Sequence, residues 1–486
     1  MNEGAEAVYA PWNAYGLAVR WGVMSIPLIL ASKSQPRRDV LFNVGVCPTI
    51  RVSHVNEDAV LDRRAHEQGV SVNALPIADK VCTLSQAKAM AVYEAYKAVA
   101  RTAAEATGER IIGRPLEVAA EQTVTDPGSS AAEYTEETVA SAQTRDFSDI
   151  DIPLEREPIS ATGGLADRKI GPLILGCDSM FLLDGHAYGK PHTEEVARER
   201  LQQMSGATGE LWTGHTLIDF ATGRVETAAS MATLTFCEFS ETMIDRYIAS
   251  GEPLEVAGSF TIDGLGGAFI DSITGAPSGI VGLSLPLARE LVERMGIEWT
   301  DLWNVTRDER FPQPSSKAPK TNVHQPGDGW IECACGRRHW GLNGAAGVLL
   351  ARRDAATGKV THIVMQHRAE WSAEGGTWGI PGGAIADGES TLEGALREAN
   401  EEANITPEDI EVVGSYCEDH GPWSYTTVFA FEKPGHTVQP KANDDESMEI
   451  EWVDIDDVPN HRLLTAMRTD WPRFRERIDA LAAAQQ

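Results

Sequence analysis

The sequence predicts an α/β protein made of two domains. Residues 25–300 alternate apolar, strand-like runs with helical patterns, which favours a first domain of the α/β or α+β class over residues 25–306. Residues 307–329 are rich in Pro and polar residues without periodicity, so they are interpreted as a linker. Residues 330–486 form the second domain, and residues 1–24 are an N-terminal extension. A chain of 486 residues is long enough for each domain to have its own core.

The composition limits the possible classes of function. The net charge of −30 opposes binding to long nucleic acid, whose phosphates it would repel, but it permits a small nucleotide in a locally basic pocket. No apolar run approaches the roughly 20 residues that a membrane helix needs, and the N-terminus lacks the regions of a secretory signal. Seven scattered cysteines argue against a disulfide framework. We therefore expect a cytoplasmic protein without membrane association.

The first domain begins with a segment that is typical of an anion site. The apolar run 28–31 predicts a buried strand, and a Ser-rich loop leads from it to Pro36, which suits the first turn of a helix that ends near Gly45. The free N–H groups and the dipole of such a helix attract phosphate. Ser34 can donate a hydrogen bond from the loop, and Arg37 can bind a phosphate through its guanidinium. Plain capping and surface charge remain the alternative.

Residues 171–191 predict a β-hairpin with a two-residue turn at Asp184-Gly185. Its register brings Lys190 back to the level of Asp178, and a bulge at Gly189 would let the two side chains converge. A carboxylate at the end of a buried strand can act as a general base toward water, and a lysine can neutralise a triphosphate. A simple cross-strand ion pair is the structural alternative.

Together these segments resemble the Maf family of nucleotide pyrophosphatases. The resemblance spans about residues 26–297 and rests on ordered matches that include LILASKSQPRR, VNEDA, LSQAKA, LGCDSMFLLDGHAYGKP, SGATGELWTG, SGEPLEVAGSFTIDGLGGAFI and SGIVGLSLP. It implies a Maf/ITPase-like, two-lobed mixed-sheet domain with a nucleotide-binding cleft. The residues it assigns to that cleft are Ser34, Arg37, Lys88 and Lys190 for phosphate, Glu57 for a divalent ion and Asp178 as general base.

Several positions depart from the Maf pattern. Gln35 and Pro36 stand where the family has Pro and Arg, and Asn56 replaces a carboxylate beside Glu57. Asp263 stands where the family often has Gln, which could alter base recognition. An acidic stretch of about residues 103–168, rich in Ser and Thr, separates Lys88 from Asp178 and is expected to be a flexible surface excursion of the first domain.

The second domain contains a glutamate-rich helix. Ser390 and Glu393 form a Ser-x-x-Glu capping box, so the helix should begin at about Thr391. The predicted buried stripe consists of Leu392, Ala395, Leu396, Ala399 and Ala403. Glu398, Glu401 and Glu402 share a neighbouring arc, where they repel each other unless a cation such as Mg²⁺ lies between them. A solvated acidic face is the alternative, but the preceding glycine-rich loop favours a metal site.

This segment matches the Nudix box in its spacing. The matching residues are Gly383, Glu389, Arg397, Glu398, Glu401 and Glu402. The resemblance implies a Nudix α/β/α sandwich that hydrolyses a nucleoside diphosphate-linked substrate with Mg²⁺ or Mn²⁺. Glu398, Glu401, Glu402 and the Gly383 backbone would hold the metal, and one of the glutamates would activate water. Ala399 and Asn404 depart from the pattern without removing a ligand, and Asn suits a left-handed position after the helix.

The segment CACGRRHWG leaves two interpretations open. Cys333, Cys335 and His339 are residue types that bind zinc, but a structural zinc usually takes four ligands. The alternative is a turn that leads into the strand GAAGVLLA.

The sequence therefore predicts a bifunctional hydrolase of small nucleotides that removes noncanonical or surplus nucleotides, and a homodimer is an open alternative to a monomer. In one alternative the Maf-like domain is a non-catalytic nucleotide sensor that regulates division, and only the Nudix domain is an enzyme. In another, the chain is an interaction scaffold that docks partners through its acidic stretch.

Overall fold

The computed structural model describes residues 25–113, 154–160, 163–304, 325–333 and 337–485. Contacts divide the chain into two compact units: unit 1 comprises Met1–Val92 and Ile170–Glu309, and unit 2 comprises Tyr93–Lys169 and Arg310–Gln486. The N-terminal extension 1–24 and most of the expected linker lie outside the described residues.

Unit 1 is built around a mixed sheet with the strand order β2-β1-β5-β7-β8-β9, and β6 pairs with β5. The strands are β1 (Leu28–Leu30), β2 (Thr49–Ile50), β5 (Leu173–Leu183), β6 (His186–Tyr188), β7 (Thr208–Asp219), β8 (Val225–Phe236) and β9 (Ile270–Thr274). Strand β1 runs parallel to β2 and β5, whereas β5, β7, β8 and β9 are antiparallel neighbours. The turn at Asp184-Gly185 has positive φ at both residues, which confirms the predicted two-residue hairpin.

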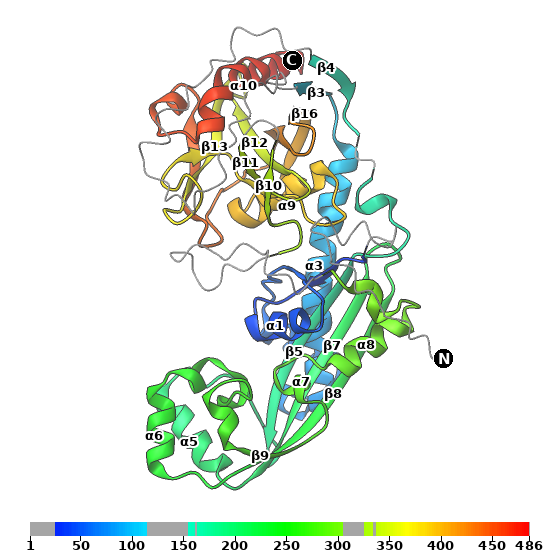
Figure 1. The fold of residues 1–486 in the computed structure, drawn as a ribbon, viewed down its shortest axis with the longest axis vertical. Helices are drawn as coiled ribbons and strands as arrows, with labels where there is room; N and C mark the ends of the chain where they lie inside the picture. Colours follow the sequence, from blue (N-terminus) through cyan, green and yellow to red (C-terminus); the bar gives the residue numbers. More distant parts are fainter. Residues whose placement is uncertain (1–24, 114–153, 161–162, 305–324, 334–336, 486) are drawn as a thin grey trace, which may run out of the picture. The chain divides into compact units, whose positions relative to one another are not determined.

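The helices of unit 1 form two lobes along the long strands. They are α1 (Gln35–Asn43), α2 (Glu57–Gln68), α3 (Ile77–Glu105), α5 (Glu194–Met204), α6 (Glu241–Ala249), α7 (Pro277–Ile280) and α8 (Leu285–Arg294). Helix α3 belongs to unit 1 as far as Val92, and its remaining residues belong to unit 2. One core gathers residues of β1, α1 and α8, and a second gathers residues of α5 and α6 with the far ends of β5, β7 and β8. Figure 1 shows α5 and α6 at one end of the long strands and α1 at the other. This arrangement confirms the two-lobed mixed-sheet fold.

Helix α3 packs closely across strands β5 and β7. A Cβ added at Gly176 would lie 2.2 Å from the Ser85 carbonyl oxygen, and one at Gly214 would lie 2.1 Å from the Val81 carbonyl oxygen. Only glycine fits at both positions, so the helix backbone rests directly on the sheet. A hydrogen bond of 2.9 Å between the hydroxyls of Ser85 and Thr216 fixes the helix at this point.

Unit 2 contains a nine-stranded sheet and a separate two-stranded hairpin. The main path runs β14-β13-β12-β17-β16-β3-β4, with β15 on β12 and β18 on β13. The strands are β3 (Glu109–Gly113), β4 (Leu154–Pro158), β12 (Ala345–Arg353), β13 (Val360–Arg368), β14 (Trp378–Gly379), β15 (Gly382–Ala384), β16 (Ile410–Asp419), β17 (Ser424–Glu432) and β18 (Ser447–Asp454). The hairpin consists of β10 (Trp330–Glu332) and β11 (Arg338–Trp340).

Helices cover both faces of this sheet. One core includes the buried residues of α10 (Thr465–Ala484), and the other includes those of α9 (Thr391–Ala403) together with Val99 and Ala103 from the end of α3. Figure 1 shows α9 and α10 on opposite sides of the sheet. The α/β/α sandwich expected from the sequence is confirmed. In the described part of the chain, no helix has the length and apolar character needed to span a membrane.

The flanks of the acidic stretch differ from the sequence expectation. The sequence predicts an excursion of the first domain, but β3 pairs in parallel with β16 of unit 2, and β4 pairs with β3. The backbone N–H of Leu165 donates to both carboxylate oxygens of Glu393 on α9, each at 3.0 Å. Both sides of the stretch therefore complete unit 2. Residues 114–153, which carry most of its acidic sequence, lie outside the described residues.

Candidate active sites

Three residues of unit 1 that the sequence predicts for the site lie together: the ammonium group of Lys88 contacts the carboxylates of Asp178 and Glu57. The Lys88 Nζ lies 2.6 Å from Asp178 Oδ1 and 2.8 Å from Glu57 Oε1. Lys88 projects from α3 one turn after Ser85, where the helix rests on the sheet, and Asp178 lies in the middle of β5. Glu57 is the first residue of α2. The close packing of α3 on Gly176 thus positions the lysine against the aspartate.

Asp178 lies in an environment that alters its acidity. Its side chain is buried, and burial raises the pKa of the carboxyl, while the nearby Lys88 ammonium and Arg37 guanidinium act in the opposite direction. Removal of the lysine contact would leave a buried carboxyl that takes up a proton more readily. The carboxylate of Asp178 can therefore serve as a general base when the Lys88 ammonium moves from it to a phosphate.

The guanidinium of Arg37 donates hydrogen bonds to other groups of unit 1. Its Nε donates to the Gly282 carbonyl at 2.9 Å, its Nη1 donates to the Cys177 carbonyl at 2.9 Å, and its Nη2 donates to Ser179 Oγ at 3.1 Å. Arg37 therefore ties α1 to the strand residues on either side of Asp178. Ser34 is the N-cap residue of α1, but its side chain makes no capping hydrogen bond to the helix.

The hairpin register does not place Lys190 opposite Asp178. Phe181 pairs with Tyr188, and β6 ends there, so a continued ladder would set residue 190 opposite Ser179. The turn lies where the sequence predicts it, but Lys190 is one residue away from the predicted level. Asn56, one of the departures from the Maf pattern, is the N-cap of α2 and accepts a hydrogen bond of 3.0 Å from the Ala59 N–H.

Helix α9 follows the sequence prediction closely. It begins at Thr391, both halves of the capping box between Ser390 and Glu393 are present, and Asn404 adopts the left-handed conformation after the helix. All five residues of the predicted stripe are buried. The glutamates of the adjoining arc are thereby held in fixed positions on one side of the helix.

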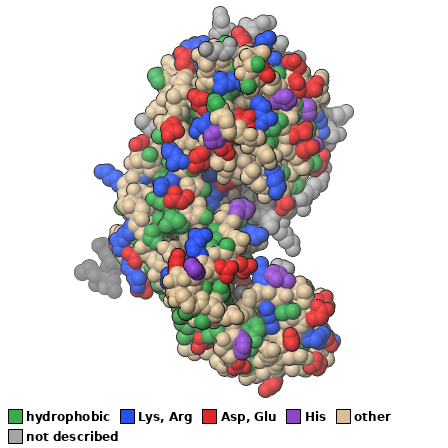
Figure 2. Space-filling model, turned by 180° about the vertical axis from the view of Figure 1, so that it is seen from behind, with side chains coloured by type: hydrophobic (Ala, Val, Ile, Leu, Met, Phe, Trp, Pro, Cys, Tyr) green, Lys and Arg blue, Asp and Glu red, His purple; other side chains and the backbone are tan. Residues whose placement is uncertain are grey.

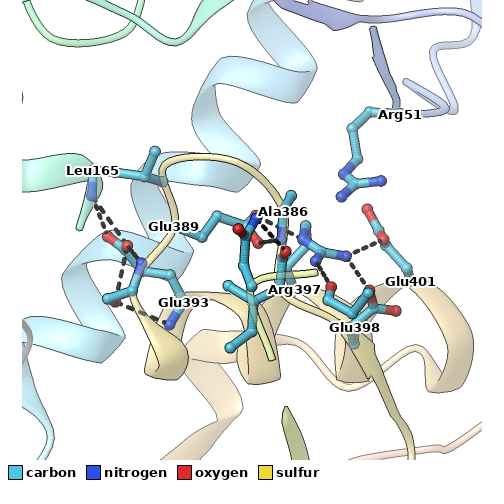
Figure 3. Close-up of polar contacts among 12 residues, drawn as sticks. Arg51, Leu165, Ala386, Glu389, Glu393, Arg397, Glu398 and Glu401 are labelled. Carbon is cyan, nitrogen blue, oxygen red and sulfur yellow. Dashed lines mark hydrogen bonds and ion pairs between the residues drawn. The ribbon is translucent and has the colours of Figure 1, made fainter. Parts of the chain in front are cut away.

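Arg397 organises the carboxylates of α9 (Figure 3). Its guanidinium donates to Glu389 at 2.6 Å, to Glu398 at 2.5 Å, to Glu401 at 3.1 Å and to the Ala384 carbonyl at 2.8 Å. Burial alone would lower the pKa of this guanidinium, but the surrounding carboxylates outweigh burial and hold the pKa well above its usual value. The arginine is a permanent cation that aligns its carboxylate partners.

Glu402 lies on the other side of the arc, next to the glycine-rich loop. Its Oε2 accepts a hydrogen bond of 2.9 Å from the Gly382 N–H. Burial, with the nearby Glu398 as the next cause, raises the pKa of Glu402 well above its usual value. Gly383 packs against Glu398, because a Cβ added there would lie 2.8 Å from the carboxylate carbon. The structure thus brings Gly383, Glu398 and Glu402 together as predicted.

Two further carboxylates belong to the same cluster and were not identified from the sequence. Asp444 and Glu446, just before β18, both raise the pKa of Glu402. Burial, followed for Glu446 by the charge of Asp444, raises the pKa of Asp444 to about 6 and that of Glu446 to about 7. The acidic run 444–446 is the sequence feature that points to these residues, but only the pairing of β18 with β13 shows that the run lies beside α9. The nearby cation Arg368 lowers the pKa of Glu402 and Glu446.

This donor set fits a divalent metal ion. Carboxylates that share a buried site raise each other's pKa because their negative charges repel, and a cation bound between them removes that cost. Hard oxygen ligands are those that Mg²⁺ and similar ions prefer.

On the face drawn in Figure 2, Lys and Arg side chains are interspersed with Asp and Glu and form no continuous basic surface among the described residues.

Two family models match this chain, one in each half. The family model described as Maf-like protein matches residues 27–295, and the model described as NUDIX domain matches residues 341–474. The chain belongs to the Maf-like family and carries a NUDIX domain, which makes it a hydrolase that combines two nucleotide-hydrolase domains.

Individual relatives show the same combination and its parts. A protein of Bifidobacterium longum, named nucleoside triphosphate pyrophosphatase/Nudix hydrolase fusion protein, is 65% identical over 484 residues, covering 95% of this chain and 100% of the relative. A nucleoside triphosphate pyrophosphatase of Leifsonia xyli is 52% identical over 146 residues, which cover 29% of this chain and 67% of the relative. The crystal structure of RenU, a Nudix hydrolase from M. Smegmatis, is 36% identical, covers 31% of this chain and 94% of that chain, and has a TM-score of 0.28.

Proposed function

We propose that unit 1 hydrolyses nucleoside triphosphates to nucleoside monophosphates and pyrophosphate, and that unit 2 hydrolyses a nucleoside diphosphate-linked substrate. The observation that carries the first half is the buried carboxyl of Asp178 in contact with Lys88, with Glu57 on the same lysine. The observation that carries the second half is the carboxylate cluster on α9 beside the glycine-rich loop. The name of the Bifidobacterium longum relative supports both halves.

In unit 1, Asp178 would take the proton of the attacking water. The water oxygen would bond to the α-phosphorus, the bond to the β-phosphate oxygen would break, and pyrophosphate would leave. Lys88 would exchange its carboxylate contacts for a phosphate and so release Asp178 to act as the base. Ser34, Arg37 and Lys190 would hold the remaining phosphate oxygens. Glu57 would help to hold a divalent ion.

In unit 2, Glu398, Glu401, Glu402 and the Gly383 carbonyl would hold a Mg²⁺ or Mn²⁺ ion. Such an ion, when bound, neutralises phosphate charge and makes bound water more acidic. One of the three glutamates would accept the proton of the attacking water, and Arg397 would keep the side chains of Glu398 and Glu401 in position. Together the two activities would remove noncanonical or surplus nucleotides.

The test compares Asp178→Asn and Glu402→Gln with the wild-type enzyme on a nucleotide panel. Pyrophosphate and phosphate release are measured with Mg²⁺ and with Mn²⁺. Matched controls are Asp184→Asn, in the exposed hairpin turn, and Glu476→Gln, on the exposed side of α10, which should leave both activities unchanged. We expect each active-site change to abolish hydrolysis of a different set of substrates.

Two outcomes would contradict this proposal. If only Glu402→Gln reduces hydrolysis while unit 1 still binds nucleoside triphosphates, unit 1 is a nucleotide sensor. If neither change affects hydrolysis of any nucleotide that wild type cleaves, the catalytic assignments themselves are wrong.

A further inference from the structure

Three metal-ligating side chains gather outside the two sites described above. Cys333 follows β10, His339 lies on β11, and His420 lies in the turn between β16 and β17. One ligand atom from each residue lies within 4.8 Å of the others. His420 is far from the other two in the sequence, so only the fold brings it to them. Cys335, the other candidate ligand in this segment, lies outside the described residues.

The His420 ring is oriented by a neighbouring carboxylate. Its Nε2 lies 2.8 Å from Glu418 Oε1, and the side chain is only 8% exposed. Its other nitrogen, Nδ1, is buried and has no hydrogen-bond partner in the described part of the protein. A buried ring nitrogen without a partner is costly, and each such atom requires an explanation. A cation bound at Nδ1 would supply one, because ligating histidines commonly bind a carboxylate through their second nitrogen.

Aromatic packing fixes the other histidine at the same place. The His339 ring is stacked on Trp423, with centroids 4.0 Å apart and an angle of 10° between the planes. Trp423 in turn donates a hydrogen bond of 3.0 Å from its Nε1 to the Trp340 carbonyl. The centroids of the two histidine rings are 4.8 Å apart. The histidines thus approach each other on a rigid aromatic support.

We propose that Cys333, His339 and His420 bind a zinc ion at a site separate from the glutamate cluster of α9. One thiolate and two imidazoles are ligands that suit Zn²⁺ and are poor ligands for Mg²⁺. Zinc bonds of about 2.0–2.3 Å would require the ligand atoms to move together by roughly 1 Å, which side-chain rotation can supply. A ligand from solvent would complete the tetrahedron.

The metal would join two segments of unit 2. It would fasten the β10–β11 hairpin to the β16–β17 turn. The hairpin leads directly to β12, where Ala346 and Gly347 pair with Gly383 and Gly382 of the glycine-rich loop. The zinc would therefore stabilise the start of β12, the strand that pairs with the glycine-rich loop.

The first experiment measures the zinc content of the full-length, untagged protein by mass spectrometry after dialysis. We expect about one zinc per chain in the wild type and in the controls Cys237→Ser, a cysteine of unit 1, and Glu402→Gln, in the carboxylate cluster. Cys333→Ser and His420→Ala should each lose most of that zinc. Equal zinc content in wild type and Cys333→Ser would overturn the proposal.

A second measurement on the wild type avoids dependence on variants that fold poorly. Zinc is removed with a chelator and Co²⁺ is added, and the absorption spectrum is recorded. We expect a cobalt–thiolate charge-transfer band together with the visible bands of tetrahedral cobalt. Absence of the thiolate band in folded wild-type protein would overturn the proposal. Neither readout depends on hydrolytic activity.

Discussion

Replacement of Gly176 by Ala should separate the lysine from the base in unit 1. The added Cβ would lie 2.2 Å from the Ser85 carbonyl oxygen and 2.8 Å from the Ala89 N. An ordinary contact needs about 3.4 Å, so α3 must move away from β5 by roughly 1 Å, at a cost of about 1–3 kcal/mol. Lys88 lies between Ser85 and Ala89 and moves with them, which lengthens its 2.6 Å contact with Asp178.

The expected loss of activity follows from this displacement. A misplacement of about 1 Å among catalytic groups can reduce the rate on the order of 10²-fold. The assay is kcat/KM for pyrophosphate release from the preferred nucleoside triphosphate, with thermal unfolding recorded in parallel. Hydrolysis by unit 2 on its own substrate should be unchanged.

The matched control is Gly189→Ala, because a Cβ added there would have no atom within 4 Å. This variant should retain the stability and the pyrophosphate release of the wild type. If Gly176→Ala behaves like the control, the close packing of α3 on β5 does not position Lys88, and the reasoning is refuted.

Three further predictions concern both units. Arg397→Met removes the buried cation that Glu389, Glu398 and Glu401 contact, so it should cost about 3–5 kcal/mol, with a larger stabilisation by added Mg²⁺ than in wild type. Thermal unfolding checks this, and the control Arg475→Met, at a partly exposed arginine of α10, should cost less than about 1 kcal/mol. Burial lowers the pKa of His215 to about 4, so the unfolded chain takes up the proton first as pH falls from about 6.5, and unit 1 should lose up to about 3 kcal/mol of stability by pH 4. Urea unfolding at several pH values measures that loss, and a His215→Gln variant with an undiminished pH dependence would contradict it. Gly108→Ala places a Cβ 1.9 Å from the Val413 carbonyl oxygen, so it should destabilise unit 2 and reduce Nudix hydrolysis, whereas unchanged unfolding would show that β3 adds nothing to that sheet.

Local signals in the sequence predicted the glutamate helix well. The capping box, the buried stripe and the left-handed Asn404 all depend on residues of a single helix and its ends, and the structure confirms each of them. The two-residue turn at Asp184-Gly185 is similarly local, since two residues with positive φ define it. For such features the physical cause is contained in a short window of sequence.

Contacts between distant segments could not be predicted in this way. The strand ERIIG over 109–113 is short and adjoins an acidic stretch, and its partner β16 lies about three hundred residues later. Asp444 and Glu446 join the carboxylate cluster of α9 only because β18 pairs with β13. The one-residue error at Lys190 has the same origin, because the end of a strand ladder depends on packing that periodicity does not record.

The pairing of β3 with β16 has a consequence for the synthesis of the chain. The residues of β3 and β4 leave the ribosome before the last strands of unit 1, but their partner strand is made only after unit 1 is complete. Until then β3 presents an unpaired edge, which invites association with other chains. A shortened protein that ends after unit 1 would keep this exposed edge permanently. The two units are therefore best expressed as one polypeptide, because a fragment that begins after unit 1 lacks the strands β3 and β4 that pair with unit 2.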